Sequence, residues 1–175
     1  MASTECKNER EFIAELDNNA DLLNLDQVKI SPTGAAGANL EPCDFLSRTK
    51  QFIHLKDGQS SEPISHLWNQ GVVSAESFAR DEEFRIKLRK EAKKRQKRAP
   101  LKAGFEVLLP DGRSKPVTSE YTVVFGIMRA PYATSGQLGL PFFSKVSFRT
   151  VANRIRAMSY PVEVHLIKKV KTAVP

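Results

Sequence analysis

An apolar run of eight residues, Tyr121–Met128, constrains the fold more than any other part of the chain. It is rich in β-branched residues and shows no alternation of polar and apolar positions, which is typical of a strand buried on both faces. Such a strand needs a layer of other elements against each face. The rest of the chain must therefore supply both neighbouring strands and covering helices.

Hydrophobic periodicity predicts those elements. Helices are expected at 8–20 and at 62–70, where Gly71 ends the helix, then from Ser74 into a basic helix at 81–99, and finally from Ser144. Further strands are expected at 26–30, 41–46, 51–56 and 162–167. The order αβββααβαβ predicts an α/β (α+β) fold, in which a mixed sheet is flanked by helices within a single domain over residues 1–175.

The positive charge is concentrated in one stretch. The chain has 27 Lys and Arg against 20 Asp and Glu, and ten of the bases lie within 85–102, where Glu91 is the only acid. Pro100 ends the basic helix, and a connecting loop is expected at about 100–118. Such a run is the footprint expected for nucleic acid, although a solvated helix face or a targeting tract remains an alternative. The residues predicted to hold phosphates are Lys87, Lys90, Lys94 and Arg95 here, and Lys145 and Arg149 on the last helix.

Composition excludes several classes of protein. No window reaches the roughly 18 consecutive apolar residues that a membrane span requires, so no membrane association is expected. The first residues lack the layout of a signal peptide. Cys6 and Cys43 are too few for a disulfide framework and are not spaced as a metal knuckle. We therefore expect a cytoplasmic protein.

Polar side chains meet where two predicted neighbouring strands end. Asp44 lies on the 41–46 strand, and His54 and Lys56 lie near the end of the next one. Because side chains two apart on a strand share a face, His54 and Lys56 point the same way, across the turn from Asp44. A carboxylate that binds a divalent cation and a lysine that stabilises a developing anion suit phosphodiester hydrolysis.

The segments Pro42-Cys43-Asp44 and His54-Leu55-Lys56, in this order of elements, resemble the PD-(D/E)xK restriction-endonuclease-like superfamily. The resemblance implies a nuclease that uses Mg²⁺ or Mn²⁺, bound by Asp44. His54 replaces the acidic residue that usually precedes the lysine, and imidazole is a weak ligand for Mg²⁺. A glutamate of the first helix, Glu11 or Glu15, is therefore expected to compensate, and we take Glu15 as the second metal ligand.

Residues around the 62–70 helix extend the predicted site. Gln70 resembles the glutamine that follows the motif in many of these nucleases, and it completes a catalytic set with Asp44, His54 and Lys56. Ser60, Ser61 and His66 are expected to contact nucleic acid near the start of the helix.

Each of these residues has a structural alternative. The serines could only cap the helix, and His66 and Gln70 could be surface residues. Asp44 could cap the turn or pair with Arg48, and His54 could be a buried, hydrogen-bonded histidine.

A wider resemblance covers about 41–168, including Glu41–Leu46, Phe52–Lys56, Ser65–Glu76 and Leu140–Val146. It is to the C-terminal part of a sporadically distributed bacterial family of uncharacterised proteins. The patchy distribution suggests genome defence, with DNA favoured over RNA as the partner. The longer members of this family imply an N-terminal or separate partner protein for target recognition. The resemblance to restriction-like nucleases, which often pair to cut two strands, implies a homodimer. The rival interpretation is a catalytically inactive nucleic-acid-binding or assembly module of the same fold.

Overall fold

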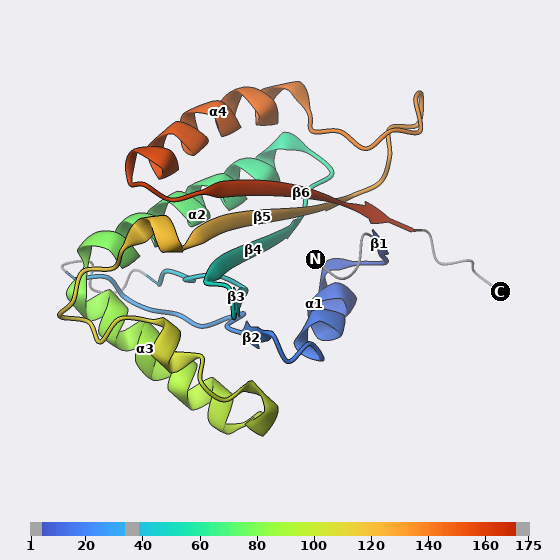
Figure 1. Cartoon of the computed structure of the whole chain (residues 1–175). Helices are drawn as coiled ribbons and strands as arrows, with labels where there is room; N and C mark the ends of the chain where they lie inside the picture. The colour runs from blue at the N-terminus through green and yellow to red at the C-terminus, as the bar shows by residue number, and fades with distance from the viewer. Residues whose placement is uncertain (1–4, 34–38, 171–175) are drawn as a thin grey trace.

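The computed structural model describes residues 5–33 and 39–170, which form a six-stranded mixed sheet covered by helices (Figure 1). The strands are β1 (Glu5–Cys6), β2 (Leu22–Asn24), β3 (Phe45–Ser47), β4 (Gln51–Asp57), β5 (Thr122–Arg129) and β6 (Val162–Lys169). They lie in the order β1-β6-β5-β4-β3-β2. The first four in this order run parallel, while β3 is antiparallel to β4 and β2 is antiparallel to β3.

Helices cover both faces of the sheet, as the sequence predicts. They are α1 (Glu9–Asp17), α2 (Ser61–Arg80), α3 (Glu82–Lys97) and α4 (Phe142–Ala157). Figure 1 shows α2 and α4 side by side on one face and α1 on the other. Short 3₁₀ turns at 100–102, 106–108 and 118–120 occupy the connection between α3 and β5.

The alternating side chains of β5 divide the core in two. Phe125 points toward α2, where the indole of Trp68 meets its ring edge-on at a centroid distance of 4.7 Å. Val124 and Met128 point to the opposite face, in a second cluster with Phe12 of α1. The expectation of a strand buried on both faces is therefore confirmed.

The prediction that Gly71 ends a helix is wrong, because α2 continues from Ser61 to Arg80. A Cβ at Gly71 would lie 2.4 Å from Cε1 of Phe125, so the glycine allows the helix to approach the sheet closely. Ser74, where the next helix was expected to begin, is buried inside α2, and its hydroxyl donates a hydrogen bond to the carbonyl of Pro42. Both small residues are therefore explained by the close packing of α2 against its neighbours, and neither marks the end of a helix.

Other boundaries also differ from the predictions. The expected strand at 26–30 is reduced to a single bridge between Ile30 and Leu40, and β2 lies before it. The strand expected at 41–46 begins only at Phe45, and α4 begins at Phe142 instead of Ser144. Residues 34–38, between the two partners of the Ile30–Leu40 bridge, lie outside the described residues.

The described residues contain neither a membrane-spanning helix nor a disulfide. No helix among them is long and apolar enough to cross a bilayer. Cys6 and Cys43 are both buried and unpaired, as expected for a chain without a disulfide framework.

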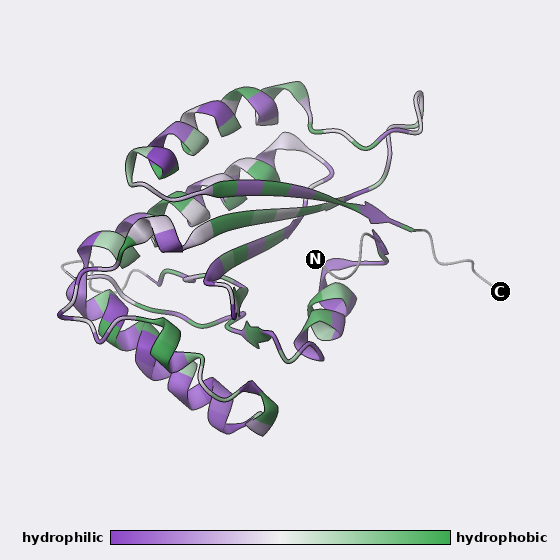
Figure 2. Ribbon diagram, in the orientation of Figure 1, coloured by the Kyte–Doolittle hydropathy of each residue, from purple (hydrophilic) through white to green (hydrophobic). Residues whose placement is uncertain are grey.

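The basic stretch is partly structural. Figure 2 shows α3 as mostly hydrophilic, but Arg85 is only 4% exposed and Lys102 only 7%. Lys102 Nζ lies 2.6 Å from both the backbone oxygen and Oδ1 of Asp17, at the end of α1. These two bases therefore hold the fold together and do not belong to a surface that could meet nucleic acid.

Candidate metal site and its cavity

A cavity of about 930 Å³ lies where the end of β4 meets α2 and the first turn of α1. Its walls include Asp44, Lys56, His66 and Gln70, so the structure brings four of the predicted site residues together. The remaining wall residues are ones for which the sequence predicted no part in the site. They are Glu9, Asp26, Gln27, Lys29, Asn39, Leu40, Glu41, Leu55, Asn69 and Val73.

Three carboxylates converge in this cavity. One oxygen from each of Asp26, Glu41 and Asp44 lies within 4.8 Å of the others. Glu41 is held on both sides, because its Oε1 accepts from the backbone N–H of Gln27 at 2.5 Å and its Oε2 accepts from Nε2 of Gln70 at 3.0 Å. The carboxylates are thus fixed by the fold at a separation that suits a shared cation.

Burial makes this cluster electrostatically costly without a cation. The pKa of Asp44 is raised to about 8, mainly by burial and also by the negative charges of Glu41, Asp26 and Glu9, even though Oδ2 accepts a 2.5 Å hydrogen bond from the N–H of Leu55. Burial likewise raises the pKa of Glu41. A divalent cation would offset the cost of these buried negative charges, and carboxylate oxygens are the hard ligands that Mg²⁺ and Mn²⁺ prefer.

Lys56 lies on the rim of the cavity and is held by α1. Its Nζ is 3.2 Å from Oε1 of Glu9, whose Oε2 accepts from the backbone N–H of Asp57 at 2.8 Å. The lysine side chain is 36% exposed, so it meets solvent in the cavity as well as the glutamate. Glu9 therefore orients Lys56 at the end of β4.

His54 does not line this cavity. Its side chain is 1% exposed, its ring stacks on Phe125 at a centroid distance of 5.8 Å, and Nε2 is buried without a hydrogen-bond partner in the described structure. Burial lowers the pKa of His54 to about 4, so the ring is neutral at pH 7. Of the two interpretations of His54, the geometry matches a buried core histidine, although one without the expected hydrogen bond at Nε2.

Replacing His54 with leucine, a side chain of similar volume, should make the protein less sensitive to acid. As the pH falls from 6.5 to 4, the unfolded chain binds a proton at His54 that the folded protein does not bind, so stability is lost over this interval. Urea unfolding should show the wild type losing about 2–3 kcal/mol more than His54→Leu. His165→Leu, at an exposed histidine paired with Glu163, is the control. Equal acid sensitivity in the wild type and His54→Leu would contradict the prediction.

Glu15 lies away from the carboxylate cluster. It lines a smaller cavity with Glu11 and Cys6, between α1 and β1. Ser60 and Ser61 also fall outside the walls of the cavity: Ser60 is the N-cap of α2 but makes no capping hydrogen bond through its side chain, and the Ser61 carbonyl accepts from Ser65 Oγ. The helix α1 does contribute an acid to the cavity, but that acid is Glu9.

The predicted phosphate-binding bases are distributed over two helices. On α3, Lys87 donates to the carbonyl of Ser31 at 3.0 Å, Lys94 pairs with Glu91, and Arg95 donates to the carbonyl of Asp26 at 3.0 Å. Arg95 therefore supports the segment that carries a carboxylate of the cluster. Lys90 is exposed on α3, and Lys145 and Arg149 are exposed on α4.

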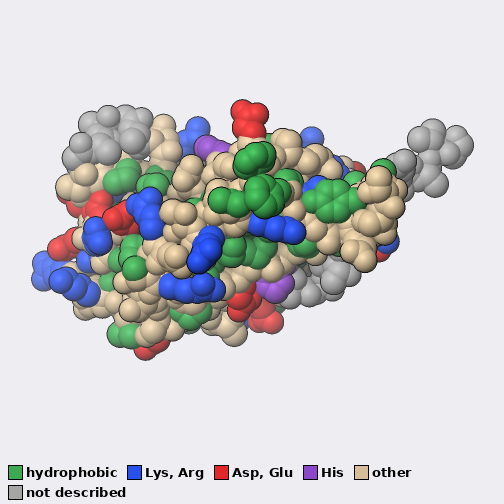
Figure 3. Space-filling model, turned by 90° about the horizontal axis from the view of Figure 1, so that it is seen from above, with side chains coloured by type: hydrophobic (Ala, Val, Ile, Leu, Met, Phe, Trp, Pro, Cys, Tyr) green, Lys and Arg blue, Asp and Glu red, His purple; other side chains and the backbone are tan. Residues whose placement is uncertain are grey.

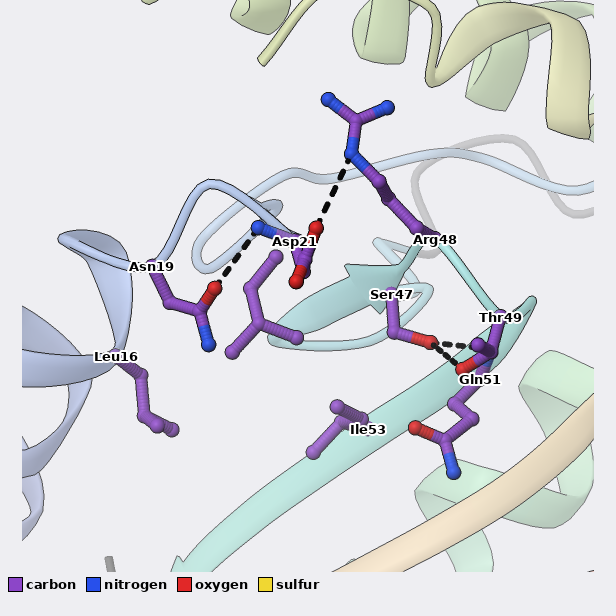
Figure 4. A pocket seen from close by; sticks show the side chains of 9 residues that line it. Leu16, Asn19, Asp21, Ser47, Arg48, Thr49, Gln51 and Ile53 are labelled. Carbon is purple, nitrogen blue, oxygen red and sulfur yellow. Dashed lines mark hydrogen bonds and ion pairs between the residues drawn. The ribbon is translucent and has the colours of Figure 1, made fainter. Parts of the chain in front are cut away.

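A second cavity, of about 380 Å³, lies between α1 and the β3–β4 turn (Figure 4). Leu16, Leu22 and Ile53 contribute apolar walls, and an ion pair between Arg48 and Asp21 at 3.4 Å crosses its rim. The alternative in which Asp44 pairs with Arg48 is therefore wrong, because Arg48 pairs with Asp21. The cavity contains none of the predicted site residues.

One family model matches nearly the whole chain, over residues 2–168, and it describes a family of unknown function, DUF6119. The chain belongs to this family. No curated protein and no solved structure matches it. The expectation of a family without an assigned activity is confirmed, but the match begins well before residue 41. The DUF6119 domain therefore includes α1 and β2, and with them Glu9 and Asp26 of the cavity.

Proposed function

We propose that this chain is a divalent-metal-dependent nuclease domain with a PD-(D/E)xK-like core. The observation that carries the proposal is that oxygens of Asp26, Glu41 and Asp44 lie within 4.8 Å of one another in the cavity that also holds Lys56. The order of elements is consistent with such a core: α1, the antiparallel strands β2 to β4, α2, and β5 parallel to β4.

The carboxylates that we assign to the metal are Asp44, Glu41 and Asp26. Glu41 and Asp26 take the place of the acid that His54 replaces in the motif, and of Glu15, which lies in another cavity. Gln70 serves as a positioning residue, because its amide holds Glu41.

Each side chain has a defined part in hydrolysis. When bound, the cation would polarise the phosphodiester and lower the pKa of a water molecule. The ammonium group of Lys56 offsets the negative charge that develops on the phosphate oxygens, and Glu9 keeps it directed along the rim. His66, on the α2 wall, is placed to contact the nucleic acid beside the scissile phosphate.

The broader proposal keeps the remaining expectations. The substrate is DNA in preference to RNA, two copies of the chain act together to cut two strands, and an N-terminal or separate protein supplies target recognition. A cytoplasmic role in defence against mobile elements follows from the same resemblance. The exposed bases of α3 and α4 contribute phosphate contacts.

A metal titration tests the activity. Mg²⁺ and Mn²⁺ are added in parallel to the purified protein with plasmid DNA or single-stranded RNA as substrate. Cleavage should depend on the metal and disappear in Asp44→Ala and Glu41→Gln, whereas Glu15→Gln and His54→Leu should cleave as the wild type does. Loss of cleavage in a folded Glu15→Gln protein, or full activity in Asp44→Ala, would overturn the assignment.

Lys56→Met should reduce the cleavage rate on the order of 10²–10³-fold, because a positive charge next to the developing anion is removed. Metal affinity, measured by calorimetry, should stay close to the wild-type value, since the lysine is not a metal ligand. Lys115→Met, at an exposed lysine before β5 that has no part in the proposed site, is the matched control and should change the rate little. A Lys56→Met protein with the wild-type rate would remove the lysine from the mechanism.

A non-catalytic nucleic-acid-binding module is the second candidate. It is favoured by the ion pair of Lys56 with Glu9, because the carboxylate offsets the positive charge that a phosphate would otherwise meet. Salt-sensitive binding to nucleic acid without cleavage at any concentration of either metal would select this candidate.

A further inference from the structure

The first two turns of α4 carry an exposed apolar surface. Phe142, Phe143 and Val146 are 72%, 74% and 53% exposed. The two phenyl rings meet edge to face with centroids 5.6 Å apart. We call these three residues, together with Lys145 and Arg149, the α4 patch. Single exposed apolar side chains are common, but large ones that lie next to one another are typical of a contact surface.

The core of the protein does not require the α4 patch. α4 is anchored by Val151, Ala152 and Ile155, which are buried, and by Phe148, whose ring contacts Trp68 at a centroid distance of 4.7 Å. Phe142 and Phe143 precede these anchors and project from the helix start. The helix is therefore held on the protein by other residues, and the exposure of the two phenylalanines is not needed for its packing.

The charge around the α4 patch is positive. No Asp or Glu occurs between Glu120 and Glu163, whereas α4 alone carries two lysine or arginine residues in the patch and two beyond it. Of these, Arg154 is paired with Glu76 at 3.4 Å, but among the described residues Lys145 and Arg149 form no ion pair. Seen from above, over α4, the molecule shows a hydrophobic patch flanked by Lys and Arg side chains (Figure 3).

We propose that the α4 patch binds a single-stranded nucleic acid. Unpaired bases stack on Phe142 and Phe143, and the backbone phosphates lie against Lys145 and Arg149. Aromatic rings next to unpaired cations are complementary to this ligand, whereas the bases of a duplex are stacked on one another and cannot reach a phenyl ring. The inference rests on the proposed function and deepens it, because it gives the domain a contact for an unpaired strand of its nucleic-acid substrate, outside the cavity where cleavage is proposed.

Fluorescence anisotropy with a short labelled oligo(dT) tests this binding. The assay is performed in EDTA, so that neither metal nor cleavage contributes. The double variant Phe142→Ala/Phe143→Ala should bind oligo(dT) about tenfold or more weakly, as expected for the loss of base stacking, and should bind a labelled duplex as the wild type does. Leu101→Ala/Val107→Ala, which truncates two other exposed apolar side chains, is the matched control and should bind both like the wild type.

The cations are tested by the dependence of binding on salt. Lys145→Glu/Arg149→Glu should reduce the slope of log affinity against log salt for oligo(dT) by about 1.4, as expected for two lost phosphate contacts. Unchanged oligo(dT) binding in the phenylalanine variant, or an equal loss for duplex, would overturn the proposal.

Two other occupants are tested with the same variants. Binding of the wild type, but not the phenylalanine variant, to phosphatidylserine vesicles, with unchanged oligo(dT) affinity, would make the α4 patch a membrane contact. A change from dimer to monomer in sedimentation, again with unchanged oligo(dT) affinity, would make it a self-association surface. Because the binding assay contains no metal, a failure of the proposed nuclease activity leaves its result intact.

Discussion

Asp44→Asn should abolish metal-dependent cleavage and, at the same time, make the metal-free protein more stable at alkaline pH. The amide keeps an oxygen that can accept from the N–H of Leu55, but it carries no charge to bury beside Glu41 and Asp26. A residue chosen for stability alone would therefore not be aspartate. Loss of function with a gain in stability would indicate that Asp44 is there for its charge.

The gain in stability at high pH follows from the direction in which the pKa of Asp44 is shifted. The pKa of Asp44 is raised from 3.8 to about 8, so between these values the folded protein holds a proton that the unfolded chain has released. The contribution of Asp44 to stability is present below pH 3.8 and is lost as the pH rises toward 8. At pH 8 the asparagine variant should be more stable than the metal-free wild type by about 2–5 kcal/mol.

Urea unfolding with and without Mg²⁺ measures both effects. Saturating Mg²⁺ should stabilise the wild type by about 2.7 kcal/mol at a hundred times the dissociation constant and should leave Asp44→Asn unchanged. Asp21→Asn, at a carboxylate with 74% side-chain exposure, is the control and should respond to Mg²⁺ as the wild type does. The same Mg²⁺ response in Asp44→Asn would show that the carboxylate cluster does not hold the ion.

Arg85→Leu should destabilise the protein by about 3 kcal/mol or more. The guanidinium is 4% exposed and donates to the carbonyls of Phe78, Ala79 and Gly112 at 2.8–3.3 Å. It thereby joins the end of α2 and the turn at Gly112 to α3. Leucine would leave these buried carbonyls without a donor, which costs more than the loss of the average hydrogen bond.

The control for this substitution lies one turn along the same helix. Arg89→Leu removes an equal charge at a half-buried position, and its urea midpoint should stay close to that of the wild type. If Arg85→Leu and Arg89→Leu have the same midpoint, Arg85 is one more solvated base of α3. Arg85→Lys should recover only part of the stability, because an ammonium group cannot reproduce the planar fork of the guanidinium.

Much of the fold could be predicted because local patterns dominate it. The continuous apolar run of β5 and the helical periodicity of α1 and α4 depend on neighbours in sequence. β1 could not be predicted, because two residues form a strand only when β6 lies beside them. Gly71 misled for a similar reason, since its role depends on the ring of Phe125, which is far away in the chain.

The candidate site divides in the same way. Asp44, Lys56 and Gln70 were found because the motif and the strand order bring them to one cavity. The side-chain alternation of a strand correctly puts His54 and Lys56 on one face, but it does not say where α2 stops covering that face. His54 is buried in the core, whereas Lys56, two residues further along β4, lies at the rim of the cavity and reaches solvent.

No sequence pattern predicted that the acids outside the motif would lie in the cavity. Asp26 and Glu41 come from irregular segments whose path depends on tertiary contacts, including the hydrogen bond from Arg95 to the Asp26 carbonyl. The presence of Glu41 only three residues before Asp44 was the one hint available in the sequence.

The parallel pairing of β4 with β5 also sets an order in which the protein can assemble during its synthesis. The polar residues that we assign to the cavity all lie between Glu9 and Gln70, whereas the strand that supports β4 begins at Thr122. As the chain leaves the ribosome, these acids emerge well before β5 does, and β4 has only the short β3 beside it. We therefore expect a nascent chain ending before residue 122 to bind no metal, and the site to form only when β5 joins the sheet.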